Sequence, residues 1–213
     1  MKVDPNKQAK DRLLLAMLPH VVFDGWSKRS IIAGQRDLKK DGIDPSLLFP
    51  RGMRDVAMHF GEFMDREMTA ELSKINLEEM PIRERIASCV TTRLKLLAPH
   101  KEAVRRLLSF LALPGNQLSG LKMTLRTVDL IWHAAGDTAT DFNYYTKRGL
   151  LASIYASTIL FWLSDTSKSQ DDTRLFLSRR INEVMKIPGL KASIVKQIKW
   201  LSGPLGLIKR RSF

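Results

Sequence analysis

Residues 129–185 read DLIWHAAGDTATDFNYYTKRGLLASIYASTILFWLSDTSKSQDDTRLFLSRRINEVM, and they are the most informative part of the chain. At its centre, residues 150–163 are almost wholly apolar and aromatic, and the segments on either side show helical periodicity. The run is too short to span a bilayer, which needs about 20 residues. It therefore predicts a helix buried against other helices of its own core, a second subunit or a hydrophobic ligand.

The rest of the chain also has the pattern of helices. Apolar residues recur at spacings of three and four, and no run alternates between apolar and polar residues as a half-buried strand does. Ser27 is a good amino-terminal cap, and Gly136 and Pro188-Gly189 are typical helix stops. The sequence predicts an all-α protein of about nine or ten helices. They are expected near residues 7–22, 27–38, 45–49, 50–72, 81–97, 99–113, 118–135, 138–163, 171–187 and 190–201.

These helices group into three expected segments, residues 1–78, 79–189 and 190–213. The first has the element order of a helix-turn-helix unit, and with the larger helical unit behind it the architecture resembles TetR-type regulators. The segment in the place of the recognition helix, Pro45-Ser-Leu-Leu-Phe-Pro50, has no Arg, Asn, Gln or Lys to read base edges. We therefore expect a degenerate helix-turn-helix scaffold without DNA-reading residues, followed by a ligand-binding helical unit.

Charge and cysteine content restrict the setting. The chain has 35 basic and 22 acidic residues, a formal net charge of +13, which favours nucleic acid or an anionic membrane as partner. A single cysteine, Cys89, excludes an intrachain disulfide and suits a reducing compartment. The polar amino terminus, with Asp4 and Asp11, shows no secretory signal. The expected location is the bacterial cytoplasm, peripheral on the inner membrane, or the mitochondrial matrix side if a presequence has been removed.

The last segment, residues 190–213, carries basic residues and no acid. On a helix, Leu190, Ile194, Ile198 and Leu201 form one apolar stripe, with lysines on the opposite side, which is typical of a helix lying in a membrane interface. The alternative is a terminal helix docked on its own domain with a solvated basic face. The residues expected to contact the membrane are Ile194, Lys196, Ile198, Lys199, Trp200 and Leu201.

No residue pattern indicates catalysis. Asp129, His133 and Asp137, spaced by four, are the best candidate metal ligands, but Asp137 lies beyond the break at Gly136. Capping and surface hydrogen bonding explain them more simply. Cys89 lies on an apolar helical face, as a small core residue does. Gly-x-Ser-x-Gly, Walker and Gly-x-Gly-x-x-Gly motifs are absent from the sequence, so we expect a protein that is not an enzyme and binds no metal or cofactor.

Several separated motifs occur in order between residues 135 and 181. They are Ala135-Gly-Asp137, Thr140-Asp-Phe-Asn-Tyr-Tyr-Thr-Lys-Arg148, Tyr155-Ala-Ser-Thr158, Trp162-Leu-Ser-Asp165 and Asp172-Thr-Arg-Leu-Phe-Leu-Ser-Arg-Arg-Ile181. Together they resemble the signature of the coenzyme Q biosynthesis accessory proteins, the "coenzyme Q nine" family. The upstream segment Phe49-Pro-Arg-Gly-Met-Arg-Asp55 is similar to that family as well.

The resemblance implies a TetR-like fold that has lost DNA reading, a homodimer and a hydrophobic pocket for isoprenoid or phospholipid. The implied function is that of a non-catalytic lipid-binding protein of ubiquinone biosynthesis, which binds isoprenoid quinone intermediates at the membrane and presents them to a demethoxyubiquinone hydroxylase-type enzyme. Tyr144, Tyr145 and Arg148 match the family's partner-binding patch, although some members carry Trp in place of Tyr144. The residues expected to contact lipid are Leu94, Leu97, Phe110, Met123, Leu151 and Tyr155. The alternative is a TetR-type transcriptional regulator with a hydrophobic effector.

Overall fold

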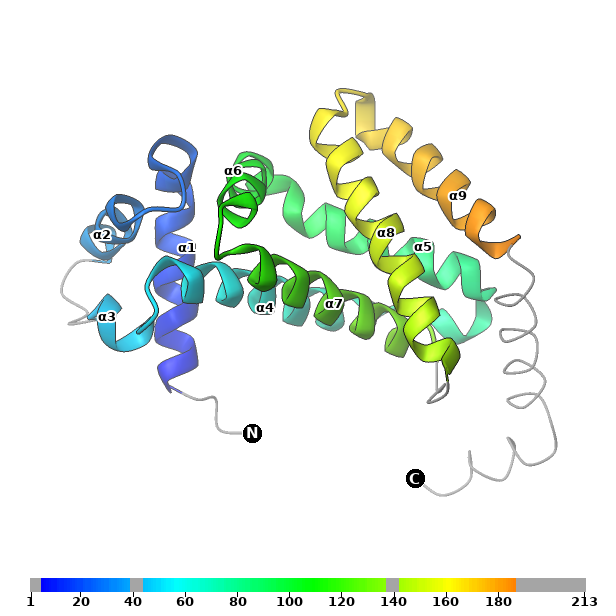
Figure 1. Ribbon diagram of the computed structural model, residues 1–213, viewed down its shortest axis with the longest axis horizontal. Coiled ribbons are helices and arrows are strands. Elements are labelled where there is room, and N and C mark those ends of the chain that lie inside the picture. The colour runs from blue at the N-terminus through cyan, green and yellow to red at the C-terminus, as the bar shows by residue number, and fades with distance from the viewer. Residues whose placement is uncertain (1–4, 39–43, 137–141, 187–213) are drawn as a thin grey trace, which may run out of the picture. The chain divides into compact units, whose positions relative to one another are not determined.

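The computed structural model describes residues 5–38, 44–136 and 142–186 (Figure 1). These residues form nine α-helices and three 3-10 helices with no strand, which confirms the all-α prediction. None of the described helices is long and apolar enough to cross a bilayer. The α-helices are α1 Pro5–Asp24, α2 Lys28–Asp37, α3 Pro45–Leu48, α4 Met53–Leu72, α5 Ile82–Leu97, α6 Lys101–Ala112, α7 Gln117–Ala134, α8 Phe142–Ser164 and α9 Asp171–Met185. The 3-10 helices are η1 Leu77–Glu79, η2 Ala98–His100 and η3 Lys168–Gln170.

The chain packs into two compact units, and each unit combines two separate stretches of sequence. Unit 1 takes residues 1–73 and 92–127, and unit 2 takes residues 74–91 and 128–213. The unit boundaries fall within α5 and α7, so each of these helices contributes to both units. The sequence analysis expects continuous segments instead, residues 1–78 and 79–189. Local sequence signals do not show that the two halves of a long helix pack with different neighbours, so they could not indicate this division.

The turn between α1 and α2 organises the core of unit 1. The side chain of Ser27 caps α2 by accepting a hydrogen bond from the backbone of Ser30, as the sequence predicts. The indole of the preceding Trp26 is buried, donates to the carbonyl oxygen of Ala103 on α6 at 2.9 Å, and meets the ring of Phe60 on α4 edge to face. Trp26 therefore ties the short amino-terminal helices to α4 and α6.

Unit 1 also contains a buried ion pair that links α4, α5 and α7. Asp65 and Arg93 are almost fully buried, and Nη1 of Arg93 lies 3.1 Å from Oδ1 of Asp65. Thr127 donates to the same oxygen at 2.8 Å, and Nε of Arg126 lies 3.4 Å from Oδ2. Burial raises the pKa of Asp65, while the charge of Arg93 opposes this shift. Removing either partner would leave the other as an unpaired charge in the interior of unit 1, which is strongly destabilising.

The apolar helix predicted from residues 150–163 is α8, which packs against α9 in unit 2 (Figure 1). Trp162 of α8 and Leu177 of α9 are fully buried between their neighbours, and the rings of Phe161 and Phe176 stack with centroids 4.5 Å apart. Leu160 remains exposed. Most of the apolar residues of this run are therefore buried in the core of unit 2. This is one of the three explanations that the sequence left open, the others being a second subunit and a hydrophobic ligand.

The α8–α9 turn is held by a carboxylate that caps α9. Asp165 accepts hydrogen bonds from the backbone of Ser167 at 2.7 Å and of Thr173 at 2.9 Å, and Ser167 accepts one from the backbone of Asp172. These bonds satisfy two of the free amide groups in the first turn of α9. Burial alone raises the pKa of Asp165, but the hydrogen bonds from Ser167 and Thr173 outweigh it and hold the pKa well below its ordinary value.

Replacing Asp165 by Ala is expected to lower the free energy of unfolding by about 1–2 kcal/mol at neutral pH, the usual effect of losing a cap. Because the pKa of Asp165 is lowered by folding, its contribution is present above the pKa of the unfolded chain and is lost as the pH falls toward the folded value. Urea denaturation at neutral and acidic pH measures this difference. Asp172→Ala, a change at an exposed carboxylate of the same turn, is the control and should cost about 1 kcal/mol or less.

Candidate functional site

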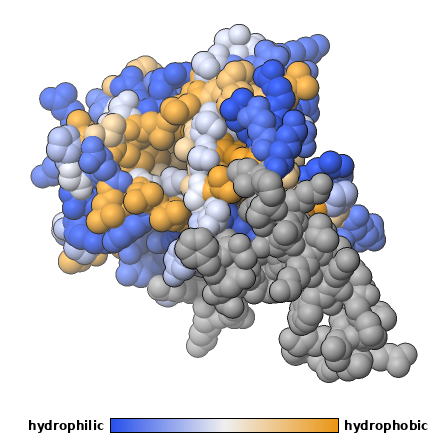
Figure 2. All heavy atoms as spheres, turned by 45° about the vertical axis from the view of Figure 1, so that its right-hand side comes forward, coloured by the Kyte–Doolittle hydropathy of each residue, from blue (hydrophilic) through white to orange (hydrophobic). Residues whose placement is uncertain are grey.

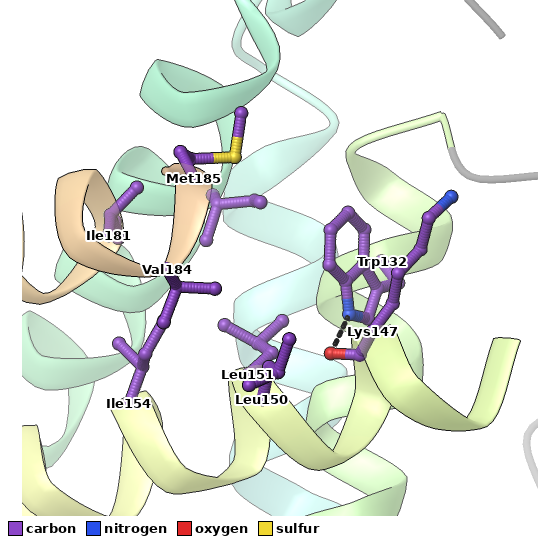
Figure 3. Close-up of a pocket in the computed structure, with 9 residues that line it drawn as sticks. Trp132, Lys147, Leu150, Leu151, Ile154, Ile181, Val184 and Met185 are labelled. Carbon is purple, nitrogen blue, oxygen red and sulfur yellow. Dashed lines mark hydrogen bonds between the residues drawn. The ribbon is translucent and has the colours of Figure 1, made fainter. Parts of the chain in front are cut away.

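Unit 2 contains a small, mostly apolar pocket between α5, α7, α8 and α9. Its empty volume is about 280 Å³, including the part that is open to solvent. The residues that line it are Ile86, Trp132, Lys147, Leu150, Leu151, Ile154, Ile181, Val184 and Met185. Figure 3 shows the indole of Trp132 on one side of the pocket and the side chains of Val184 and Met185 across from it. Such a lining suits an apolar ligand and offers no nucleophile.

Trp132 and Lys147 form the polar edge of this pocket. The indole Nε1 of Trp132 donates to the backbone oxygen of Lys147 at 3.2 Å, which fixes the ring of α7 against α8. The side chain of Lys147 is almost fully buried, and its Nζ lies 5.6 Å from the centroid of the Trp132 ring, close enough for a cation–π contact. In Figure 3 this amine points away from the side chains of α9. The pocket wall is therefore apolar although it includes a lysine.

The residues expected to contact lipid do not gather in one place. Leu151 lies in the pocket wall, and Tyr155 is buried one turn further along α8 without lining the pocket. The other four, Leu94, Leu97, Phe110 and Met123, belong to unit 1. Leu94 and Leu97 are buried there, and Phe110 and Met123 are half-buried. Lipid contact by these residues stays a prediction.

The partner patch expected at the start of α8 contains one exposed ring and one anchored guanidinium. Tyr145 is 74% exposed. Arg148, one turn later, donates from Nε and Nη2 to Oδ1 of Asp129 on α7 at 2.7 and 2.6 Å, and only 13% of its side chain is exposed. The side chain of Tyr144 lies outside the described part of the chain. Tyr145 thus faces solvent, while Asp129 sets the position of Arg148.

The contact with Arg148 also gives Asp129 a structural role. Asp129 was one of three candidate metal ligands, of which His133 is exposed and Asp137 lies outside the described residues. Within the described ranges, no group of three or more His, Cys, Asp or Glu side chains is arranged to hold a metal ion. Cys89 is fully buried, and burial raises the pKa of its thiol to about 11, so it is the inert core residue that the sequence predicts.

The helix in the place of a DNA-recognition helix is α3, a single turn. Asp44 caps it by accepting hydrogen bonds from the backbone and hydroxyl of Ser46, which lower the pKa of this carboxyl group. An ionised carboxylate at this end of α3 repels phosphate, and Leu47 is exposed where a base-reading side chain would be needed. The expected membrane residues, from Ile194 to Leu201, lie outside the described residues.

The sequence did not point to several residues of the pocket wall. Trp132, Val184 and Met185 come from two helices that are more than 50 residues apart in the chain. The helical spacing of Val128, Ile131 and Trp132 could have indicated a buried face of α7. No local signal shows that this face meets the end of α9.

Comparison with known proteins gives a consistent result. The family model COQ9 matches residues 118–188. The chain is 33% identical over 203 residues to "Ubiquinone biosynthesis protein COQ9, mitochondrial" of Homo sapiens, covering 92% of this chain and 62% of the relative. It is 34% identical to the COQ9-B protein of Xenopus laevis, with 85% and 64% covered, and 26% identical to the "Probable ubiquinone biosynthesis protein coq9, mitochondrial" of Dictyostelium discoideum, with 90% and 64% covered. The chain therefore spans a little under two thirds of the length of these relatives.

A solved structure shows the fold. The TetR transcriptional regulator from Nitrosomonas europaea superposes with a TM-score of 0.64, covering 84% of this chain and 98% of that one, at 22% sequence identity. The TetR-like fold predicted from the element order is confirmed. At this level of identity the likeness concerns the fold alone.

Proposed function

This chain belongs to the COQ9 family, and from that membership we propose that it serves ubiquinone biosynthesis as a non-catalytic lipid-binding protein. It binds an isoprenoid quinone intermediate at a membrane and presents it to a demethoxyubiquinone hydroxylase-type enzyme. The curated relatives named above carry ubiquinone biosynthesis in their names. Their names also include the word mitochondrial. Of the two expected locations, this supports the matrix side of the mitochondrial membrane.

The observation that carries this proposal is the apolar pocket of unit 2. Its wall consists of aliphatic side chains and one indole, and the only ionisable side chain in it, Lys147, has its amine against Trp132. Such a wall can bury the apolar surface of a ligand, and it contains no nucleophile that would react with the ligand. Since each buried methylene group contributes about 0.8 kcal/mol, a prenyl chain gains free energy by leaving water for a wall of this kind.

The pocket must widen to hold a whole prenyl chain. Its empty volume of about 280 Å³ includes space that is open to solvent, so the enclosed part is far too small for a prenyl chain. Val184 and Met185 stand at the carboxyl end of α9 and are only half-buried, so their side chains can move with little loss of packing. We place the entry of the ligand at this end of α9, directly before the basic segment 190–213 that is proposed to lie on the membrane.

Two further contacts belong to the proposal. Tyr144, Tyr145 and Arg148 bind the hydroxylase, and the outer faces of α8 and α9 form a homodimer. Leu160 and Leu175, at 62% and 63% exposure, are large apolar side chains that a dimer through these two helices would cover. Sedimentation measurements on Leu160→Glu and Leu175→Glu test the dimer, because a buried unpaired charge at this interface should yield monomers.

Protein purified by gentle extraction is expected to carry isoprenoid lipid or phospholipid, visible as an added mass in native mass spectrometry. Val184→Trp fills the pocket from α9, and the lipid-bound fraction is expected to fall at least about tenfold, since that requires only about 1.4 kcal/mol of lost binding. Asn182→Trp, an exposed position on the same helix, is the control and should retain the lipid. A wild-type protein that is empty after gentle extraction would contradict the proposed function.

The alternative, a TetR-type regulator with a hydrophobic effector, rests on the fold alone. It requires binding to a palindromic DNA site with a steep dependence on salt concentration. The short α3 helix and its acidic cap at Asp44 argue against such binding. A gel-shift series across salt concentrations separates the two functions.

A further inference from the structure

The turn from α6 to α7 carries four outward-facing leucines, which we call the leucine corner. Leu113, Leu118, Leu121 and Leu125 are 54%, 61%, 54% and 40% exposed. The last three recur at spacings of three and four, so they form one stripe along α7. Figure 2 shows that hydrophobic side chains reach the surface of this protein among hydrophilic ones. Leucines arranged in a row on an exposed helix face mark a contact with an apolar partner.

The opposite face of α7 explains why this stripe is not turned inward. Thr127 is fully buried and donates to Asp65, and the side chain of Met123 packs so closely on α4 that a Cβ at Gly61 would lie 2.6 Å from it. That inner face fixes the rotation of α7 within unit 1. The helix therefore has a second apolar face, which the packing of unit 1 leaves in solvent.

The turn itself is rigid. Asn116 is nearly buried, donates from Nδ2 to the carbonyl oxygen of Phe110 at 3.0 Å, and accepts at Oδ1 from Nε of Arg54 at 3.3 Å. Its backbone donates to the carbonyl oxygen of Leu113 at 3.1 Å. Gly115, between them, has φ of 86°, a left-handed conformation that glycine adopts without strain. Leu113 and Leu118 are thus presented to solvent by a turn whose buried polar groups are satisfied.

The stretch of unit 1 that carries the leucines is strongly basic in sequence. From residue 92 to residue 127 the only acidic side chain is Glu102, whose carboxylate contacts both Arg105 and Arg106. The basic side chains in this range are Arg93, Lys95, Lys101, Arg105, Arg106, Lys122 and Arg126. Arg93 is buried, whereas Lys95, Arg105 and Lys122 are exposed. Lys122 and Arg126 directly follow Leu121 and Leu125 on α7.

We propose that the leucine corner, with its flanking lysines and arginines, is a second membrane-contact element that inserts into the interface of an anionic bilayer. Apolar side chains reach the acyl boundary while basic side chains remain at the headgroups, which is the arrangement of an interfacial helix. Each basic residue near an anionic surface raises partitioning about fivefold. The inference rests on the proposed membrane association and adds a site in unit 1, separate from the segment 190–213.

The chemistry of the corner selects a bilayer over nucleic acid. Nucleic acid would use the basic side chains but has no need of four leucines, since phosphate contacts are polar. A bilayer interface uses both. A partner protein with an apolar acidic surface is the remaining occupant, and the experiment includes it as an outcome that contradicts the proposal.

The test uses the full chain with an environment-sensitive fluorophore at single introduced cysteines, Leu113→Cys and Leu118→Cys. Cys89 is fully buried and burial raises the pKa of its thiol to about 11, so it does not compete for the label. Ser73→Cys is the control. Ser73 is exposed at the end of α4, about 28 Å along the helix from Arg54, which contacts the corner. Trp200→Cys reports the terminal segment independently.

Vesicles of phosphatidylcholine with phosphatidylserine should shift the emission at positions 113 and 118 to the blue, and vesicles without phosphatidylserine should do so much less. The label at position 73 should not respond. A shift at position 200 alone overturns the leucine corner and leaves the proposed function intact, whereas no shift at any position overturns both. A label at 118 that is already blue-shifted without vesicles, or shifts only when the hydroxylase is added, shows a protein contact and overturns the proposal.

A double substitution provides a second readout. Leu118→Gln with Leu121→Gln should reduce partitioning onto the anionic vesicles at least about tenfold in flotation, because two leucines no longer enter the interface. Phe23→Gln with Leu47→Gln, which removes two other exposed apolar side chains of unit 1, should leave flotation unchanged. Equal flotation of the wild type and the α7 variant contradicts the proposal.

Discussion

Asp65→Ala is expected to lower the free energy of unfolding by about 3–5 kcal/mol in urea denaturation, the typical loss when one partner of a buried ion pair is removed. Arg93 is 3% exposed and would keep its charge in a site without the carboxylate that lies 3.1 Å away. Thr127 would also lose the acceptor for its hydroxyl. Asp65 lies on α4 and contacts groups of α5 and α7, so its loss affects the packing of all three helices.

The neighbouring acid provides the control for this substitution. Glu62 lies on the same helix and contacts Arg126 at 2.6 Å, but both side chains are more than 40% exposed. Glu62→Ala should therefore cost about 1 kcal/mol or less. Replacing both members of the buried pair, Asp65→Leu with Arg93→Met, should recover most of the loss because no unpaired charge remains. A cost below about 1 kcal/mol for Asp65→Ala contradicts the assigned role.

Tyr145→Ala is expected to weaken capture of the demethoxyubiquinone hydroxylase-type enzyme about 30-fold, the effect of losing an aromatic anchor worth about 2 kcal/mol. The side chain is 74% exposed, so its removal should leave the melting temperature unchanged. Arg148→Ala should weaken binding as well and also remove the contact with Asp129. Biolayer interferometry with the immobilised hydroxylase measures both effects.

Two variants separate a direct contact from a general disturbance. Phe23→Ala removes another highly exposed aromatic side chain, from unit 1, and should leave hydroxylase binding unchanged. Asp129→Asn keeps the size of the residue and weakens its hold on Arg148, so an intermediate loss of binding indicates that Asp129 positions this guanidinium. Wild-type affinity in Tyr145→Ala contradicts the proposed partner patch.

The positions of the helices were predictable because their signals are local. Ser27 accepts a hydrogen bond from Ser30 three residues away, and Gly136 ends α7 with φ of 86°. Most predicted boundaries lie within a few residues of those observed. The start of α6 is two residues later than predicted because Ala98–His100, which include Pro99, form a 3-10 turn. The order of these elements was enough to indicate the TetR-like fold, and the motifs between residues 135 and 181 were enough to indicate the family.

The helices and the family were thus predictable from local signals, since capping, glycine stops and apolar periodicity act within one or two turns. Which side chains meet depends on the packing of helices that are far apart in the chain, and no local signal carries that information. Arg148 binds Asp129 on another helix, Asp65 binds Arg93, and Trp132 shares a pocket with Met185. The leucines of α7 show the same limit. Their spacing shows that they share one face of α7, but it is the packing of Thr127 and Met123 on the other side that turns this face to solvent.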